Sequence, residues 1–196
     1  MPENDKLAKY IQQFGIMTDE DACKLSSCFK EVKVKKKQFI VQPDFTAKTR
    51  NFIVKGSMRA YVIGQKGEEH TILLGIENWW ITDYDSYINQ QPASMFVVAM
   101  EDSTLLQLPF EKEQELKSSN HKYETFFRIR AEMGHAFQQK RLIDNLTLSA
   151  EDRYKSFSES YPLIVQRVPQ YTLASYLGMS TEFLSRIRGK NRKRSS

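Results

Sequence analysis

The sequence predicts an α+β fold: an antiparallel β domain first, then a long helix, then a small helical domain. Three observations predict it. Short β-like runs alternate with turn residues between about 30 and 110, an uninterrupted helical pattern covers 118–147, and helical segments punctuated by prolines follow. A chain of 196 residues is long enough for two small domains. We therefore expect three parts, at residues 1–117, 118–147 and 148–196.

The first 28 residues predict short helices that flank the β domain. Leu7 and Ile11 recur at helical spacing, and Gly15 interrupts the pattern. Thr18 precedes the acidic run Asp19–Asp21, which is the order of an N-cap and an acidic first turn. A second helix should therefore begin directly after Thr18.

Residues from about 30 to 110 are expected to form short strands. Their β-branched and aromatic residues occur in runs bounded by turn signals such as Gly56-Ser57 and Gly64–Gly67, at the spacing of a small antiparallel sandwich or barrel. The pattern stops between Trp79 and Pro92, where Asp83–Tyr87 can form a short helix, and a ligand pocket would be lined at such an interruption. The expected strands are Phe39–Val41, Phe52–Val54, Met58–Ile63, Thr71–Ile76, Met95–Met100 and Thr104–Leu108.

Residues 118–147 predict one long helix that joins two copies of the chain. They contain no proline, and a helix of about 30 residues would span roughly 45 Å, more than a domain of this size covers on one side. Lys140 interrupts the apolar stripe along it. The stripe either pairs with a second copy, giving a homodimer, or packs on the chain's own β domain. Its residues are Phe126, Ile129, Met133, Ala136 and Ile143.

A helix-turn-helix pattern covers 170–187, after a helix that Ser149 caps. Ala174 is small where two helices would cross, and Gly178 permits the left-handed backbone that ends the first of them. Ser180 can cap the second helix. The apolar residues expected between the two helices are Leu173, Leu177, Leu184 and Ile187.

The outer face of the second helix carries groups that can bind DNA. After Glu182 the chain has no acidic residue, and basic residues accumulate over 186–194, which favours a polyanionic partner. The pattern alone also fits a plain helical hairpin, and the basic tail at 189–196 either lies along phosphates or is a solvated run. The candidate contacts to double-stranded DNA are Ser180, Thr181, Glu182, Ser185, Arg186, Arg188 and Lys190.

With its parts in this order, the whole chain resembles the Crp/Fnr superfamily of transcription regulators, named for the cyclic-AMP receptor protein and the fumarate-nitrate regulator. The segments that carry the resemblance are Val54–Tyr61, Leu148–Tyr154, Arg167–Pro169 and Leu184–Arg188. The resemblance implies that the first domain is a cyclic-nucleotide-binding-like β-roll and a sensor, followed by a dimerisation helix and a DNA-binding domain. It also implies that Glu182 and Arg186 read bases and that Ser180 contacts phosphate. Where other members carry arginine this chain has Thr181, so we expect a different operator, and the family's wing is truncated because only 189–196 remain for it.

The sensor departs from the cyclic-nucleotide-binding members. Those members hold the ribose with a Gly-Glu pair and the cyclic phosphate with an Arg-Ser pair, whereas Thr82-Asp83 and Ala93-Ser94 stand at the corresponding positions here. Without the arginine, the phosphate lacks a charge-assisted partner. We therefore expect no tight binding of cyclic AMP, and an effector, if there is one, that is an unidentified small molecule. The residues expected to line its pocket are Trp79, Thr82, Asp83, Ala93 and Ser94, although core packing is the alternative role for Trp79.

Other function classes find little support in the sequence. Cys23 and Cys28 are too few for an iron–sulfur cluster or an all-cysteine zinc site, and no catalytic motif is present, so we expect no metal, no cofactor and no enzyme. His70 beside Glu68-Glu69 keeps a cupin-like metal enzyme as a remote alternative. A sensor that acts through a protein partner, without specific DNA binding, is the nearer one. We expect neither a signal peptide nor a membrane span, which places the protein in the cytoplasm.

Overall fold

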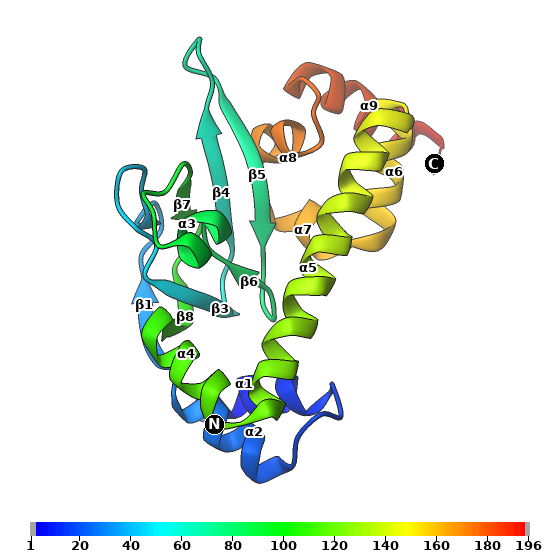
Figure 1. Cartoon of the computed structure of the whole chain (residues 1–196). Coiled ribbons are helices and arrows are strands. Elements are labelled where there is room, and N and C mark those ends of the chain that lie inside the picture. The colour runs from blue at the N-terminus through cyan, green and yellow to red at the C-terminus, as the bar shows by residue number, and fades with distance from the viewer. Residues whose placement is uncertain (1–2, 195–196) are drawn as a thin grey trace.

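The chain folds as the predicted β domain, long helix and small helical domain (Figure 1). The computed structural model describes residues 3–194, with side chains over 3–190. Two short helices come first, α1 (Glu3–Gln12) and α2 (Asp19–Ser27). Thr18 caps α2 as expected, because its hydroxyl accepts a hydrogen bond from the Asp21 amide at 3.2 Å.

The β domain is a sandwich of two four-stranded sheets, in the orders β1-β8-β3-β6 and β2-β7-β4-β5. All strand pairs are antiparallel. A buried apolar cluster that includes Ile53, Met58, Val97 and Leu105 fills the space between the sheets. The strands are β1 (Lys30–Val34), β2 (Phe39–Val41), β3 (Thr49–Lys55), β4 (Met58–Ile63), β5 (Glu69–Gly75), β6 (Trp80–Ile81), β7 (Phe96–Ala99) and β8 (Ser103–Pro109).

The β3–β4 turn requires a glycine at its centre. Gly56 has a φ of +102°, and a Cβ built on it would collide with the side chain of Ser103. The Gly56-Ser57 turn signal was therefore interpreted correctly. Between β6 and β7 lies the short helix α3 (Tyr84–Asn89), at the predicted interruption of the strand pattern.

The outer face of the first sheet is covered by α1, α2 and the start of the long helix. Side chains alternate along β3, so that Ile53 points into the sandwich. Phe52 and Val54 point to the opposite face of the sheet, where they belong to a second buried apolar cluster. Leu7 of α1 and Leu25 of α2 are buried against the same face. The N-terminal helices thus belong to the core of the β domain.

The long helix begins later than predicted. A separate helix, α4 (Phe110–Ser119), follows β8, and α5 (His121–Thr147) starts after Asn120, whose side chain accepts a hydrogen bond from the Lys122 amide at 2.9 Å. Phe126 of α5 is 0% exposed and packs edge-on against Phe14 of the N-terminal segment. Its assignment to the dimerisation stripe was wrong, because the first turns of α5 use their apolar side chains within the subunit.

The helical domain comprises α6 (Ala150–Ser160), α7 (Pro162–Arg167), α8 (Gln170–Tyr176) and α9 (Thr181–Arg194). Ser149 caps α6 by accepting a hydrogen bond from the Asp152 amide at 3.2 Å. The core of this domain continues into the β domain through Leu74 and Ile76, at the end of β5. None of the described helices is long and apolar enough to cross a membrane.

Candidate nucleic-acid interface

Helices α8 and α9 form the predicted helix-turn-helix. The four apolar residues expected between them, Leu173, Leu177, Leu184 and Ile187, are all buried. Ala174 is also buried, and its carbonyl accepts a hydrogen bond from the Met179 amide at 3.0 Å across the turn.

The turn has the conformation that its sequence indicates. Gly178 has a φ of +66°, the left-handed region in which glycine carries no Cβ penalty. Ser180 then caps α9, because its hydroxyl accepts a hydrogen bond from the Phe183 amide at 3.2 Å. The second helix is therefore held at a fixed angle to the first by a turn and a cap that are both local in sequence.

The polar face of α9 is directed to solvent. Ser180, Glu182, Ser185, Arg186 and Lys190 are exposed, while Thr181 and Arg188 are half-buried. The Arg186 guanidinium lies 5.1 Å from the centre of the Phe183 ring. Lys190 forms an ion pair of 3.0 Å with Glu151 of α6, so part of its charge is neutralised within the chain. The side chains of the tail from 191 onward lie outside the described residues.

An open groove of about 740 Å³ separates the start of α9 from the β4–β5 hairpin. Tyr171, Thr181 and Glu182 line one side of it, and Arg59 and Glu69 of the hairpin line the other. The Arg59 guanidinium is held by an ion pair with Glu69 and by a hydrogen bond of 2.9 Å from its Nε to the Thr71 hydroxyl. The hairpin wall therefore carries charged side chains, while the helical wall mixes polar side chains with the apolar surfaces of Tyr171 and Met179.

The helical domain is docked on β5 by hydrogen bonds. The Ser175 hydroxyl of α8 accepts from the Thr71 amide at 2.9 Å and donates to the Glu69 carbonyl at 2.9 Å. Because these bonds run along the edge of β5, α8 lies beside that strand (Figure 1). Strand β5 is the edge strand of the second sheet, and α8 covers this edge.

An arginine ties α7 to the opposite end of the β domain. Arg167 forms ion pairs with Glu77 and Glu101, which follow β5 and β7. Burial acts to raise the pKa of Glu77, but hydrogen bonds from Arg167 and from the Gly56 amide outweigh it and hold that pKa below its usual value. The helical domain is thus fastened to the β domain at both ends of β5.

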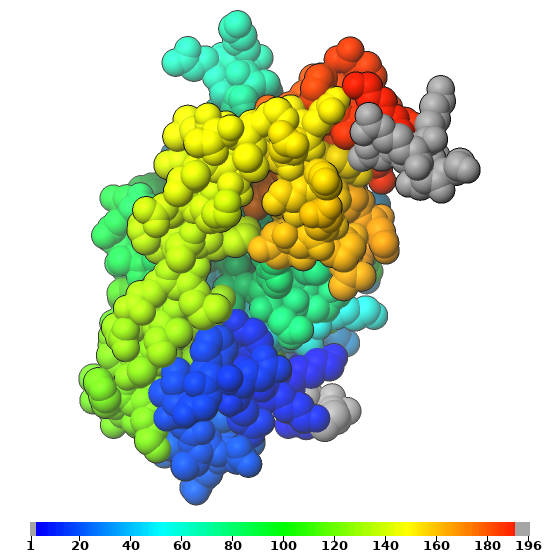
Figure 2. All heavy atoms as spheres, turned by 90° about the vertical axis from the view of Figure 1, so that its right-hand side faces the viewer, coloured from blue at the N-terminus to red at the C-terminus, as the bar shows by residue number. Residues whose placement is uncertain are grey.

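The outward face of α5 carries large apolar side chains that are exposed to solvent. Met133 is 50% exposed, Ile143 47% and Leu146 77%. Ala136 is exposed as well, and Ile129 is half-buried. Figure 2 shows α5, yellow-green to yellow, as a continuous ridge at the surface that runs along the left of the view, beside the N-terminal helices and the helical domain. We refer to Ile129, Met133, Ala136, Leu142, Ile143 and Leu146 as the α5 face.

The residues predicted to line a ligand pocket mostly stabilise the α3 segment. Asp83 is fully buried and caps α3, accepting a hydrogen bond from the Ser86 amide at 3.1 Å. Its second carboxylate oxygen accepts from the amides of Ser94 at 2.9 Å and Met95 at 3.2 Å. The amides that an anion could reach are therefore already bound by a negative charge of the chain itself.

The other predicted pocket residues are engaged in packing. The Thr82 hydroxyl donates to the Thr49 carbonyl at 3.1 Å, and Ala93 is buried in the sandwich core. Trp79 packs edge-on against Phe137 of α5 and Tyr161, which is the packing role considered as its alternative. The structure brings Asp83 and Ser94 together by a hydrogen bond, whereas Trp79 packs between the sandwich core and the core of the helical domain.

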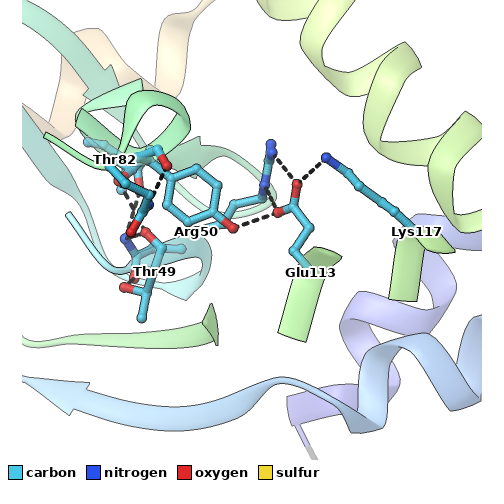
Figure 3. Close-up of polar contacts among 9 residues, drawn as sticks. Thr49, Arg50, Thr82, Glu113 and Lys117 are labelled. Atoms are coloured by element: carbon cyan, nitrogen blue, oxygen red, sulfur yellow. Dashed lines mark hydrogen bonds and ion pairs between the residues drawn. The ribbon is translucent and has the colours of Figure 1, made fainter. Parts of the chain in front are cut away.

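A buried ionic cluster beside α3 was missed by the sequence analysis (Figure 3). Glu113 of α4 is 0% exposed and Arg50 of β3 is 5% exposed. Two hydrogen bonds join them, Nε to Oε2 at 2.6 Å and Nη2 to Oε1 at 2.8 Å. The Tyr87 hydroxyl of α3 donates to the same carboxylate at 2.8 Å, and Lys117 lies 2.7 Å from it.

The neighbouring charges set the protonation states of Glu113 and Tyr87 in this cluster. Burial acts to raise the pKa of Glu113, but Arg50 and Lys117 together hold that pKa below its usual value. Burial and the adjacent Glu113 carboxylate both raise the pKa of Tyr87, so its hydroxyl stays protonated and donates. The cluster therefore joins β3, α3 and α4 around a carboxylate whose charged form is favoured.

The candidate metal ligands do not come together. Glu68 and His70 lie 3.3 Å apart on the β5 side of the hairpin, and within residues 3–190 no group of three or more His, Cys, Asp or Glu side chains is placed to hold a metal ion. Cys23 and Cys28 are free thiols on and after α2.

Comparison with known proteins gives matches only at the level of structure. No protein-family profile matches the chain, and no curated protein sequence matches it. FixK2 of Bradyrhizobium japonicum superposes with a TM-score of 0.71 at 13% identity, over 85% of this chain and 86% of that one. The global regulator CLP of Xanthomonas campestris, described as c-di-GMP responsive, gives 0.68 at 12% identity, over 86% and 89%.

The catabolite activator protein of Thermus thermophilus covers all of this chain, with a TM-score of 0.53 at 19% identity over 85% of its own length. Because this last match covers the whole chain, it includes the β sandwich, the long helix and the C-terminal helices. The chain has the fold of the Crp/Fnr regulators.

Each part of the Crp/Fnr fold corresponds to an element of this chain. Its β-roll is the sandwich of β1–β8, its long helix is α5, and its helix-turn-helix is α8 and α9. The resemblance drawn from Val54–Tyr61 and Leu184–Arg188 is thus confirmed at the level of the fold. At 12–19% identity the comparison establishes architecture and leaves ligand and DNA sequence to this chain's own residues.

Proposed function

We propose that the chain is a homodimeric, sequence-specific DNA-binding transcription regulator. The observation that carries the proposal is the outward polar face of α9, where Glu182, Ser185 and Arg186 are exposed on a helix that Leu184 and Ile187 anchor from below. A helix held in this way can enter a major groove with its first turns directed at base edges. Arg186 can donate two hydrogen bonds to guanine, and Glu182 can accept one from the cytosine amino group.

Phosphate contacts would come from the start of α9 and from its basic residues. The N-terminus of a helix favours anions, and Ser180 is exposed there. Its hydroxyl oxygen accepts the capping hydrogen bond, and its O–H group can donate to a phosphate. Arg188 and Lys190 add positive charge further along the helix, and Lys190 would exchange its ion pair with Glu151 for a phosphate. Thr181 is half-buried, so less of its side chain is accessible to a base than that of Glu182, which is exposed.

The proposed dimer forms through the α5 face. Ile143 and Leu146 are large, exposed and apolar, and they sit on a helix of 27 residues that spans about 40 Å. Two such helices that pack against each other would bury the exposed side chains and place one α9 on each side of a two-fold axis. That arrangement suits a palindromic operator with half-sites about one helical turn apart.

The β-roll is the proposed sensor, and cyclic AMP is not its ligand. The buried Asp83 carboxylate occupies the amides of Ser94 and Met95, and it would repel a cyclic phosphate brought to the same place. The relatives that share the fold carry names of regulators, which supports regulation rather than catalysis. A cytoplasmic location follows from the proposed access to DNA.

The test is a mobility-shift titration with the promoter fragment of the protein's own operon. We expect a shifted complex that survives a large excess of unrelated competitor DNA. The Arg186→Ala variant should lose that specific complex, while Lys33→Ala, which removes an exposed charge on β1, should keep it. If binding to all sequences weakens equally as the salt concentration rises, the chain has only a basic surface that binds DNA nonspecifically. The proposal would then be wrong, and a sensor that acts through a protein partner would be the better interpretation.

A further inference from the structure

A small cleft lies at the junction of α5, α6 and the end of α8. Its volume is about 150 Å³, and it is separate from the pocket predicted in the β-roll. Aromatic rings from each of these elements, and from the residue that follows α6, line it: Phe137, Phe157, Tyr161 and Tyr176. Phe157 stacks at a tilt against both Tyr161 and Tyr176, with ring centres 5.1 Å and 5.3 Å apart. The walls are therefore preformed.

Two arginines line the same cleft, and neither forms an ion pair with a described carboxylate. Arg153 donates from Nε to the Leu177 carbonyl at 3.1 Å, from Nη1 to the Leu148 carbonyl at 2.8 Å and from Nη2 to the Gly178 carbonyl at 3.5 Å. Arg141 lies 4.1 Å from the centre of the Tyr176 ring and donates to the carbonyls of Ile72, Thr71 and Tyr176. Both guanidiniums are thus fixed by neutral acceptors, and their charge is not compensated.

The remaining charges of the cleft cancel. Lys140 forms an ion pair with Asp144, and both line the cleft. Burial lowers the pKa of Arg141, and the adjacent Tyr176 offsets this lowering only in part, while the Asp144 carboxylate is paired with Lys140. Its Nε is buried without a hydrogen-bond acceptor. An anion placed here would therefore meet two uncompensated positive charges.

We propose that this cleft binds a small aromatic carboxylate. A cavity of about 150 Å³ accepts one benzene-sized molecule and is too small for a nucleotide. Each guanidinium uses three of its five N–H groups on backbone carbonyls, so donors remain for a carboxylate. The aromatic walls supply edge and face contacts to a single ring.

Occupation of this cleft would bias the position of the recognition helix. The ligand would touch the long helix, the first helix of the DNA-binding domain and the end of α8 at once. It would thus favour the arrangement of these elements in which the cleft has its present shape. This regulatory role rests on the proposed function, whereas binding itself does not.

The binding test uses the full chain with benzoate as the probe. Trp79 packs against Phe137 and Tyr161, which both line the cleft, so its fluorescence reports on occupancy. Benzamide, which has the same shape without the charge, and inorganic phosphate, which has charge without a ring, are the comparison ligands. The variants are Arg153→Gln, Ser156→Phe to fill the cleft, and Lys155→Gln, which removes an exposed charge of α6 that does not line it.

We expect saturable binding of benzoate, with benzamide and phosphate at least about tenfold weaker. Arg153→Gln and Ser156→Phe should each weaken benzoate binding by about tenfold or more, while Lys155→Gln stays within about twofold of the unmodified chain. The inference is overturned if benzoate gives no saturable signal below about 10 mM, if phosphate binds as well as benzoate, or if both cleft variants bind benzoate like the unmodified chain. The assay contains no DNA, so its failure is distinguishable from a failure of the proposed DNA binding.

Discussion

Replacing Glu113 by glutamine tests the buried ionic cluster of the β-roll. The substitution keeps the shape of the side chain but removes the negative charge that faces Arg50 and Lys117. Arg50 is 5% exposed, so water cannot replace the lost carboxylate. The variant therefore leaves a buried guanidinium without its counter-charge.

The expected cost is large for a single substitution. Breaking a buried ion pair by removing one partner costs about 3–5 kcal/mol. The glutamine carbonyl can still accept one hydrogen bond from Tyr87 or Arg50, so we expect the lower end, about 3 kcal/mol. For a chain of this size that corresponds to a fall in Tm of roughly 6–12 °C.

The assay is urea denaturation of Glu113→Gln beside Glu115→Gln. Glu115 lies on the same helix, but its ion pair with Lys112 is exposed, with side-chain exposures of 65% and 46%. That control should lose less than about 1 kcal/mol. Equal stability of the two variants would refute the reasoning, because burial would then have no bearing on the cost. A double variant, Arg50→Met with Glu113→Leu, should recover part of the loss, because the buried guanidinium is removed together with its partner and the one charge of the cluster left without a carboxylate, Lys117, is partly exposed.

The same cluster gives a pH dependence with a definite sign. The pKa of Glu113 is lower in the folded chain than its usual value, so the folded state binds fewer protons than the unfolded state near pH 4. Its contribution to stability is complete above the usual carboxyl pKa and is lost as the pH falls through the lowered one. Glu113→Gln should accordingly show a shallower loss of stability at acid pH than the unmodified chain.

Three further predictions concern the other features of the structure. Asp83→Ala removes the cap of α3 and the acceptor for two more amides, and should cost about 2 kcal/mol in urea denaturation; a cost below about 0.5 kcal/mol would contradict the role given to that carboxylate. Ile143→Asp should weaken the dimer by at least about 30-fold in analytical ultracentrifugation, because two half-exposed isoleucines lose burial worth about 1 kcal/mol each, and an unchanged dimer would place the interface elsewhere. Arg167→Gln removes the ion pairs to Glu77 and Glu101, so limited proteolysis between the domains should accelerate while global stability falls by no more than about 1 kcal/mol; unchanged proteolysis would mean that these ion pairs do not hold the domains together.

Features that depend on neighbouring residues could be predicted from the sequence. Gly178 and Ser180 act within one turn of chain, and their left-handed backbone and capping hydroxyl are both present. The strand Met58–Ile63 also has the predicted limits, because apolar β-branched and aromatic side chains mark it. Strand β1 was missed since it lies at a sheet edge and exposes most of its charged side chains.

Features that depend on distant pairing could not be predicted. Arg50 and Glu113 are 63 positions apart, and neither residue's local sequence indicates that the other neutralises it. Phe126 fits the helical stripe by spacing, but spacing does not tell which side of α5 the N-terminal helices cover. Leu142 and Leu146 were missed for the same reason, because they lie beside the expected stripe and only the fold leaves them exposed.

Selection from a random pool of double-stranded oligonucleotides tests the central claim most directly, with the unmodified chain and Arg186→Ala compared in parallel. We predict an enriched palindrome whose half-sites are centred about 34 Å apart, one turn of B-DNA, and a loss of preference at one guanine of each half-site in the variant. An unenriched pool, or an enriched sequence that Arg186→Ala selects unchanged, would contradict the assignment of α9 as the helix that reads DNA.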